Sequence, residues 1–158
     1  MRVASALVTS RGATRRVFLG RLGIAVACSC VAAFARAAPG RLAKAEWAAI
    51  RKVISQQLAA LRSGDDERAF GYASPGIQAQ FGDARSFMAM VRARYSALLD
   101  ARYTEFLEGA VIDGIIVQPL RLIARDNGVQ VALYTIEKEK RGWKINGCQL
   151  APSTVRAA

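Results

Sequence analysis

The stretch Asp65–Tyr95, DDERAFGYASPGIQAQFGDARSFMAMVRARY, decides the fold of this chain. It contains three helix start signals, each a side chain that can cap free backbone N–H groups: Asp65, Ser74 (followed by Pro75) and Asp83. These signals predict three short helical pieces. Apolar residues at helical spacing are expected to form one stripe of the last piece: Phe87, Val91, Tyr95 and Leu98.

The adjacent acids Asp65, Asp66 and Glu67 admit two interpretations. Neighbouring carboxylates can share a hard cation or carry out acid–base chemistry. A capping aspartate followed by an acidic first helical turn explains all three without a ligand, because the helix dipole favours negative charge there. We adopt the second interpretation and predict no metal site.

Before this stretch, apolar residues recur at spacings of three and four from Trp47 to Leu61, which predicts an amphipathic helix that ends at Ser63-Gly64. Residues 38–45 are expected to be a linker.

Residues 1–37 have the pattern of an export signal, with six arginines, no acid, an apolar run and the cleavage pattern Ala35-Arg36-Ala37. Four residues match the bacterial twin-arginine export motif: Arg15, Arg16, Phe18 and Leu19. We therefore expect a periplasmic or secreted protein with the twin-arginine export machinery as a partner. Only 14 residues separate Arg21 from Arg36, fewer than the ~20 that span a bilayer, so we expect no permanent membrane anchor.

After Tyr103 the pattern becomes strand-like, with turn residues at Asp113-Gly114, Asn127-Gly128 and Arg141-Gly142. Four strands are predicted at 103–112, 115–125, 129–140 and 143–150, joined as an antiparallel meander. Pro119 cannot donate to the ladder and is expected at an edge or a bulge, which would bend the sheet. The fold class is therefore α+β, with N-terminal helices on the concave face of a bent sheet, in a single domain at 46–151 followed by a tail at 152–158.

Composition excludes several functions. The net charge of +11 includes the six arginines of residues 1–37; the rest of the chain holds 17 of the 23 basic residues and 12 acids, too balanced for a nucleic-acid interface. Histidine is absent, which removes Ser-His and Cys-His catalysis and histidine metal ligands. Cys148 is the one cysteine after residue 37, so it has no disulfide partner there, and we interpret it as a buried apolar residue.

Residues spread over about 46–151 resemble the bacterial domain-of-unknown-function 4864 family: Gln57-Leu58, Ala69-Phe70, Ala73-Ser74-Pro75, Phe81-Gly82, Phe87, Met90-Val91, Tyr95, Trp143, Ile145 and Gly147-Cys148. That family is similar in layout to the nuclear-transport-factor-2-like (SnoaL-like) cone fold. The resemblance implies a cone-like fold and implies no activity.

The candidate ligand-pocket residues are Tyr95, Tyr103, Gln118 and Tyr134, which can orient a ligand by hydrogen bonds. Arg92, Arg94 and Arg102 could hold an anion, although a solvated helix face is the simpler interpretation. We favour a non-enzymatic domain that binds a small apolar ligand or a protein partner, with homodimerisation possible and no cofactor. The alternative is a small-molecule isomerase, dehydratase or hydrolase that uses a buried carboxylate and a tyrosine in the cone.

Overall fold

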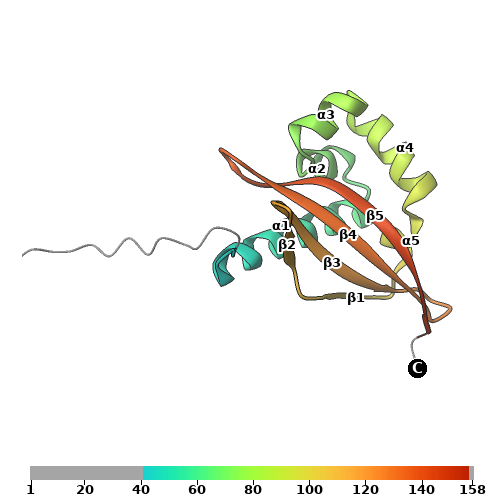
Figure 1. The fold of residues 1–158 in the computed structure, drawn as a ribbon. Coiled ribbons are helices and arrows are strands. Elements are labelled where there is room, and N and C mark those ends of the chain that lie inside the picture. Colours follow the sequence, from blue (N-terminus) through green and yellow to red (C-terminus); the bar gives the residue numbers. More distant parts are fainter. Residues whose placement is uncertain (1–40, 157–158) are drawn as a thin grey trace, which may run out of the picture. The chain divides into compact units, whose positions relative to one another are not determined.

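The computed structural model describes residues 41–156, with side chains described up to Ala151 (Figure 1). The predicted export signal, its motif residues Arg15, Arg16, Phe18 and Leu19, and its cleavage residues Ala35 and Ala37 lie outside the described residues. Among the residues that are described, no helix is both long enough and apolar enough to cross a membrane.

Helices come first and strands follow, as the sequence predicts. The helices are α1 (Lys44–Ser63), α2 (Asp66–Gly71), α3 (Pro75–Phe81), α4 (Ala84–Arg94) and α5 (Ser96–Asp100). The strands are β1 (Tyr103–Phe106), β2 (Ala110–Ile112), β3 (Ile115–Ile123), β4 (Gly128–Glu139) and β5 (Gly142–Arg156). α1 thus begins inside the predicted linker, and β5 continues into the predicted tail.

The three predicted helix starts are confirmed. Asp65 Oδ1 accepts the backbone N–H of Arg68 at 3.2 Å, and Ser74 Oγ accepts that of Ile77 at 3.2 Å. Asp83 Oδ1 accepts the N–H of Ser86 at 2.7 Å. α1 ends at Gly64, whose φ of 71° lies in the left-handed region that glycine adopts without strain.

The predicted stripe through Tyr95 and Leu98 on a single helix is wrong. α4 ends at Arg94, and Tyr95, with φ −129° and ψ 31°, separates it from α5. The Tyr95 hydroxyl donates to the backbone carbonyl of Cys148 at 2.7 Å. This bond holds the break against β5 and turns the tyrosine toward the sheet.

The strands form one antiparallel sheet in the order β1-β3-β4-β5, with β2 also paired to β3. The Asp113-Gly114 hairpin is confirmed, with φ of 51° and 80° at its two central residues. The expected count of four strands is wrong, because the segment predicted as one strand at 103–112 divides into β1 and β2.

The division lies opposite Pro119. Phe106 pairs with Leu120, and Ala110 pairs with Val117. The segment that joins β1 to β2 is therefore one residue longer than the part of β3 that it faces. The N–H of Leu107 donates to Pro119 O at 3.1 Å, but Pro119 has no N–H to return. The Gln118 side-chain amide donates to Leu107 O at 2.8 Å in its place. Pro119 is expected at an edge or a bulge; it lies in β3, an inner strand of the sheet, opposite the unpaired residues that separate β1 from β2.

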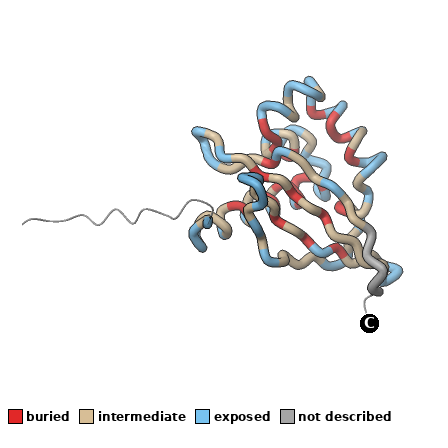
Figure 2. The backbone as a smooth tube through the Cα atoms, viewed as in Figure 1, coloured by how far each residue is buried: buried red, intermediate tan, exposed pale blue. Residues whose placement is uncertain are grey.

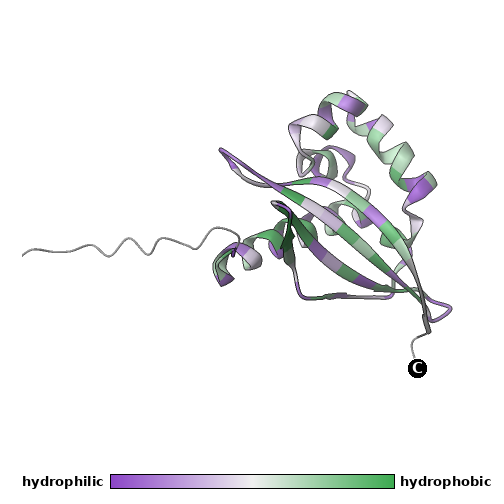
Figure 3. Cartoon of the chain, in the orientation of Figure 1, coloured by the Kyte–Doolittle hydropathy of each residue, from purple (hydrophilic) through white to green (hydrophobic). Residues whose placement is uncertain are grey.

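The helices cover one face of the sheet (Figure 1), and buried residues concentrate between the two layers (Figure 2). Alternation along the strands is visible in the hydropathy colouring (Figure 3). Gln118, Leu120 and Leu122 are buried on the helix side of β3. The opposite face carries the exposed residues Tyr103, Ile112 and Ile115. The core therefore lies between α1, α4 and the inner sheet face.

Candidate functional site

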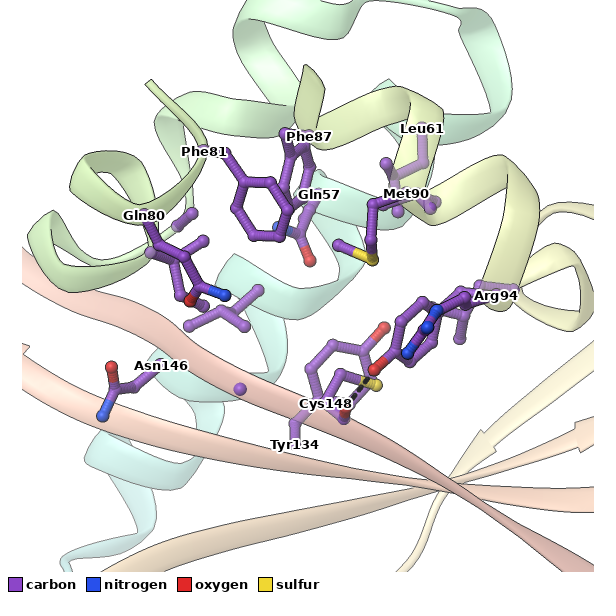
Figure 4. Close-up of a pocket in the computed structure, with 17 residues that line it drawn as sticks. Gln57, Leu61, Gln80, Phe81, Phe87, Met90, Arg94, Tyr134, Asn146 and Cys148 are labelled. Carbon is purple, nitrogen blue, oxygen red and sulfur yellow. Dashed lines mark hydrogen bonds between the residues drawn. The ribbon is translucent and has the colours of Figure 1, made fainter. Parts of the chain in front are cut away.

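A cavity of about 550 Å³ lies between α3, α4 and the inner face of β4 and β5 (Figure 4). Pockets that hold small molecules commonly measure about 300–1,000 Å³. Most of its wall is apolar, and the larger apolar side chains are Leu61, Ile77, Phe81, Phe87, Met90 and Ile145. Its size and lining suit a small organic ligand.

Packed aromatic rings form part of the helical wall of the cavity. Phe87 of α4 lies 5.4 Å from Phe70 and 5.7 Å from Phe81 between ring centroids, the second pair meeting edge to face. Such pairs add about 0.5–1.5 kcal/mol beyond the burial of their area. Because Phe87 packs against both neighbours, its ring is held in the wall of the cavity.

Tyr134 of β4 and Cys148 of β5 are cross-strand partners in the floor. Tyr134 is 0% exposed, and its hydroxyl has no hydrogen-bond partner among the described residues. The Cys148 side chain lies next to the hydroxyl, but sulfur is a weak acceptor and does not replace a hydrogen bond. A buried hydroxyl left in this state costs about 1–3 kcal/mol.

The same end of the cavity carries Tyr95 and Arg94. The Tyr95 hydroxyl is occupied by the Cys148 carbonyl at 2.7 Å, drawn as the dashed line in Figure 4. Arg94, the last residue of α4, is exposed and lies at the rim. One end of the cavity therefore combines a guanidinium with a buried phenol.

Neutral amides line the cavity elsewhere. Gln57 is buried and its amide donates to the Ala69 carbonyl at 3.2 Å. Asn146 Oδ1 accepts the Ser74 hydroxyl at 2.9 Å, and Gln80 lies nearby in Figure 4. These groups offer hydrogen bonds without charge.

The titratable groups in the floor stay protonated at neutral pH. Burial raises the pKa of the Tyr134 phenol well above its ordinary value, and it raises the pKa of the Cys148 thiol to about 12. Burial also raises the pKa of Tyr95, with Cys148 adding to the effect and Arg94 opposing it. A neutral phenol and thiol donate hydrogen bonds but act neither as general bases nor as nucleophiles. The described lining residues include no aspartate or glutamate, so the carboxylate that the enzymatic alternative needs is not among them.

The structure brings two of the four predicted pocket residues together. Tyr95 and Tyr134 both line the cavity. Tyr103 is 53% exposed on the opposite face of the sheet, where it pairs with Ile123. Gln118 is buried away from the cavity, where its Oε1 accepts Arg51 Nε at 3.2 Å.

Sequence reasoning did not place Cys148 or Arg94 at this site. The strand pattern indicated that Cys148 is buried, but its position beside Tyr134 depends on the pairing of β4 with β5. Arg94 was interpreted as part of a solvated face, and its position at the rim follows from the end of α4 there. The register shift between Thr135 and Ile136 interrupts the alternation of β5 between Ile145 and Cys148, so the strand pattern alone does not pair the two floor residues.

The acidic cluster has the structural role predicted for it. Asp65 caps α2, and Asp66 forms an ion pair with Arg92 at 3.2 Å on the surface. A second hollow of about 620 Å³ lies beside Trp47, Arg51 and Gly109. Its arginine is occupied by Gln118 and the Leu107 carbonyl, and Lys44 and Glu108 also line it.

Comparison with known proteins gives a family but no activity. A family model described as a domain of unknown function (DUF4864) matches residues 43–158. The comparison with curated proteins gives no match. The chain is similar to the crystal structure of a domain of unknown function with a cystatin-like fold from Nostoc punctiforme, with 15% sequence identity, a TM-score of 0.47, and coverage of 72% of this chain and 81% of that chain. A likeness at this TM-score carries no argument about fold or function.

Proposed function

The chain belongs to the family described as a domain of unknown function (DUF4864), and we propose that it binds a small, largely apolar molecule in the cavity between α3, α4 and β5 without transforming it. The observation that carries the proposal is the cavity floor. There the Tyr134 hydroxyl is fully buried and has no partner among the described residues, and the Tyr134 residue lines the cavity of about 550 Å³. Native interiors rarely leave a polar group in this state unless a ligand or water completes it.

Binding without catalysis fits the chemistry of the lining. The raised pKa values of Tyr134 and Cys148 keep both groups neutral, so they supply hydrogen bonds and no base. Gln57 and Asn146 are already held by protein partners, which fixes their orientation before a ligand arrives. A pre-organised pocket of this kind lowers the entropic cost of binding.

Three finer expectations remain part of the proposal. The helices and bent sheet enclosing a cavity support a nuclear-transport-factor-2-like cone. Export to the periplasm through the twin-arginine pathway rests on Arg15 and Arg16, and it would allow the domain to fold and load its ligand before export. Homodimerisation through the sheet is supported by the exposed Ile112 and Ile115.

The test is the binding of N-phenylnaphthylamine, a neutral apolar dye whose fluorescence rises in apolar surroundings. We expect saturable binding at one site. Met90→Trp should weaken it at least about 10-fold, because Met90 lines the cavity and a larger ring would fill it. The matched control is Ala89→Trp, at an exposed neighbour on the same helix.

Equal dye binding by Met90→Trp and Ala89→Trp would contradict the proposal. Absence of saturable binding to the unmodified chain would contradict it as well. Native mass spectrometry of protein purified from its own compartment reports a retained ligand and the oligomeric state in one measurement.

A further inference from the structure

The cavity lining has one charged group. Among the described lining residues this is Arg94, and no described carboxylate forms an ion pair with it. Two other arginines of the helices are engaged: Arg92 with Asp66, and Arg62 with the Leu98 carbonyl. Arg94 therefore stands at the rim as a cation without a counter-ion from the described protein.

The same end of the cavity presents donors. The Tyr134 hydroxyl points from β4 toward α4 in Figure 4 and has a proton to donate, because its raised pKa keeps the phenol neutral. Tyr95 is already occupied at Cys148 O. A group that only accepts hydrogen bonds and carries negative charge matches a guanidinium and a neutral phenol, and ionised acceptors form the stronger bonds.

The number of charged groups in the described lining indicates which anions fit the cavity. A phosphate monoester carries about 1.5 to 2 negative charges at neutral pH and usually binds several cationic or backbone donors. Here the described lining residues supply one cation, and their remaining polar side chains are neutral phenols, a thiol and amides. A single negative charge is matched, and a double charge is not.

The rest of the cavity lining indicates what kind of ligand body would fit. Phe81 and Phe87 form an apolar wall away from the Arg94 end, and Ile77 also lines the cavity. Such a wall stabilises an apolar body by about 25 cal/mol per Å² of buried area and offers nothing to a second charge. The ligand is thus amphipathic, with its polar group at one end.

We infer that the ligand is a small monocarboxylic acid with an apolar body, and this inference rests on the proposed function. The carboxylate lies at the end of the cavity formed by Arg94, Tyr95 and Tyr134. The body is an aliphatic chain or an aromatic ring system, because the chemistry of the wall is common to both.

The experiment displaces N-phenylnaphthylamine with decanoate and with decanol, which share an aliphatic body and differ in charge. A third arm uses naphthoate, with an aromatic body. We expect at least one of the two acids to displace the dye about 10-fold more tightly than decanol. Arg94→Gln should remove that advantage and leave decanol unchanged. The control Arg85→Gln, an exposed arginine of the same helix outside the cavity, should leave all three affinities unchanged.

Two outcomes overturn the inference in distinguishable ways. If decanol displaces the dye and Met90→Trp abolishes binding, but neither acid binds more tightly and Arg94→Gln changes nothing, the acid is wrong and the binding function stands. If neither the dye nor any of the three compounds binds a chain that unfolds cooperatively in urea, the proposed function falls with it. Because Arg94 is exposed, its replacement is not expected to prevent folding.

Discussion

Removing the Tyr134 hydroxyl should stabilise the ligand-free protein. The hydroxyl is fully buried and has no hydrogen-bond partner among the described residues, so it is desolvated without compensation. This state costs about 1–3 kcal/mol, and Tyr134→Phe relieves it while leaving a void the size of one oxygen. We expect a net gain of about 1 kcal/mol in the free energy of unfolding. The usual effect of a buried substitution has the opposite sign.

The measurement is equilibrium urea unfolding followed by circular dichroism. With a urea slope of about 2 kcal/mol per molar, the midpoint should rise by about 0.5 M without a change in slope. The matched control is Tyr95→Phe, which loses a 2.7 Å hydrogen bond to Cys148 O and should lower stability by about 1 kcal/mol. A loss of stability in Tyr134→Phe equal to that in Tyr95→Phe would refute the reasoning, because it would mean that the Tyr134 hydroxyl is bonded. Saturating decanoate should narrow the difference between Tyr134→Phe and the unmodified chain, since a bound acceptor completes the hydroxyl.

Three further predictions concern pH, packing and export. The Cys148 thiol has a pKa near 9.0 when unperturbed and about 12 in the fold, so the folded state holds its proton more tightly, and the free energy of unfolding should fall as pH rises from about 9 to about 12. Cys148→Ser should flatten this part of the plot of urea midpoint against pH, and a plot identical to that of the unmodified chain would contradict the prediction. Gly109→Ala should cost about 1–3 kcal/mol, because a Cβ there would lie 2.3 Å from the α1 indole ring; Gly71→Ala, whose Cβ would meet nothing within 4 Å, is the neutral control for the same unfolding assay. Residues 1–40 fused to a reporter should direct export, and changing both Arg15 and Arg16 to lysine should stop it; unchanged export would rule out the twin-arginine pathway.

Local interactions made the helix starts predictable. Asp65, Ser74 and Asp83 each cap an N–H three residues ahead, so the sequence contains both partners within one turn. The hairpin at Asp113-Gly114 is local for the same reason. These elements were predicted with their correct starts.

Distant contacts account for the errors. The break at Tyr95 is held by the Cys148 carbonyl, and a helical pattern read alone continues through it. The division of the first strand depends on Arg51 and Gln118, which are joined across the sheet–helix interface by a 3.2 Å bond. Propensity and periodicity do not register partners this far apart.

The same distinction applies to the site. Tyrosines could be nominated from composition because histidine is absent, but which ones share a cavity depends on strand pairing. Tyr134 pairs with Cys148 and faces the helices, whereas Tyr103 pairs with Ile123 on the other face. One position of shift exchanges the two faces of a strand, so small errors in pairing reassign a pocket residue.

The Gln118 amide takes the place of the N–H that Pro119 lacks, and this affects how the strands align. The Leu107 carbonyl is satisfied by Gln118 Nε2 at 2.8 Å and by Arg51 Nη2 at 3.4 Å, and this arrangement exists for only one alignment of residues 103–112 along β3. Sliding that segment by one residue would turn Phe106 to the solvent side and carry the carbonyl away from the amide, leaving it unpaired at a cost of about 1 kcal/mol or more. Pro119 and Gln118 therefore favour one alignment of β1 and β2 along β3, the alignment in which Arg51 of α1 also reaches the Leu107 carbonyl.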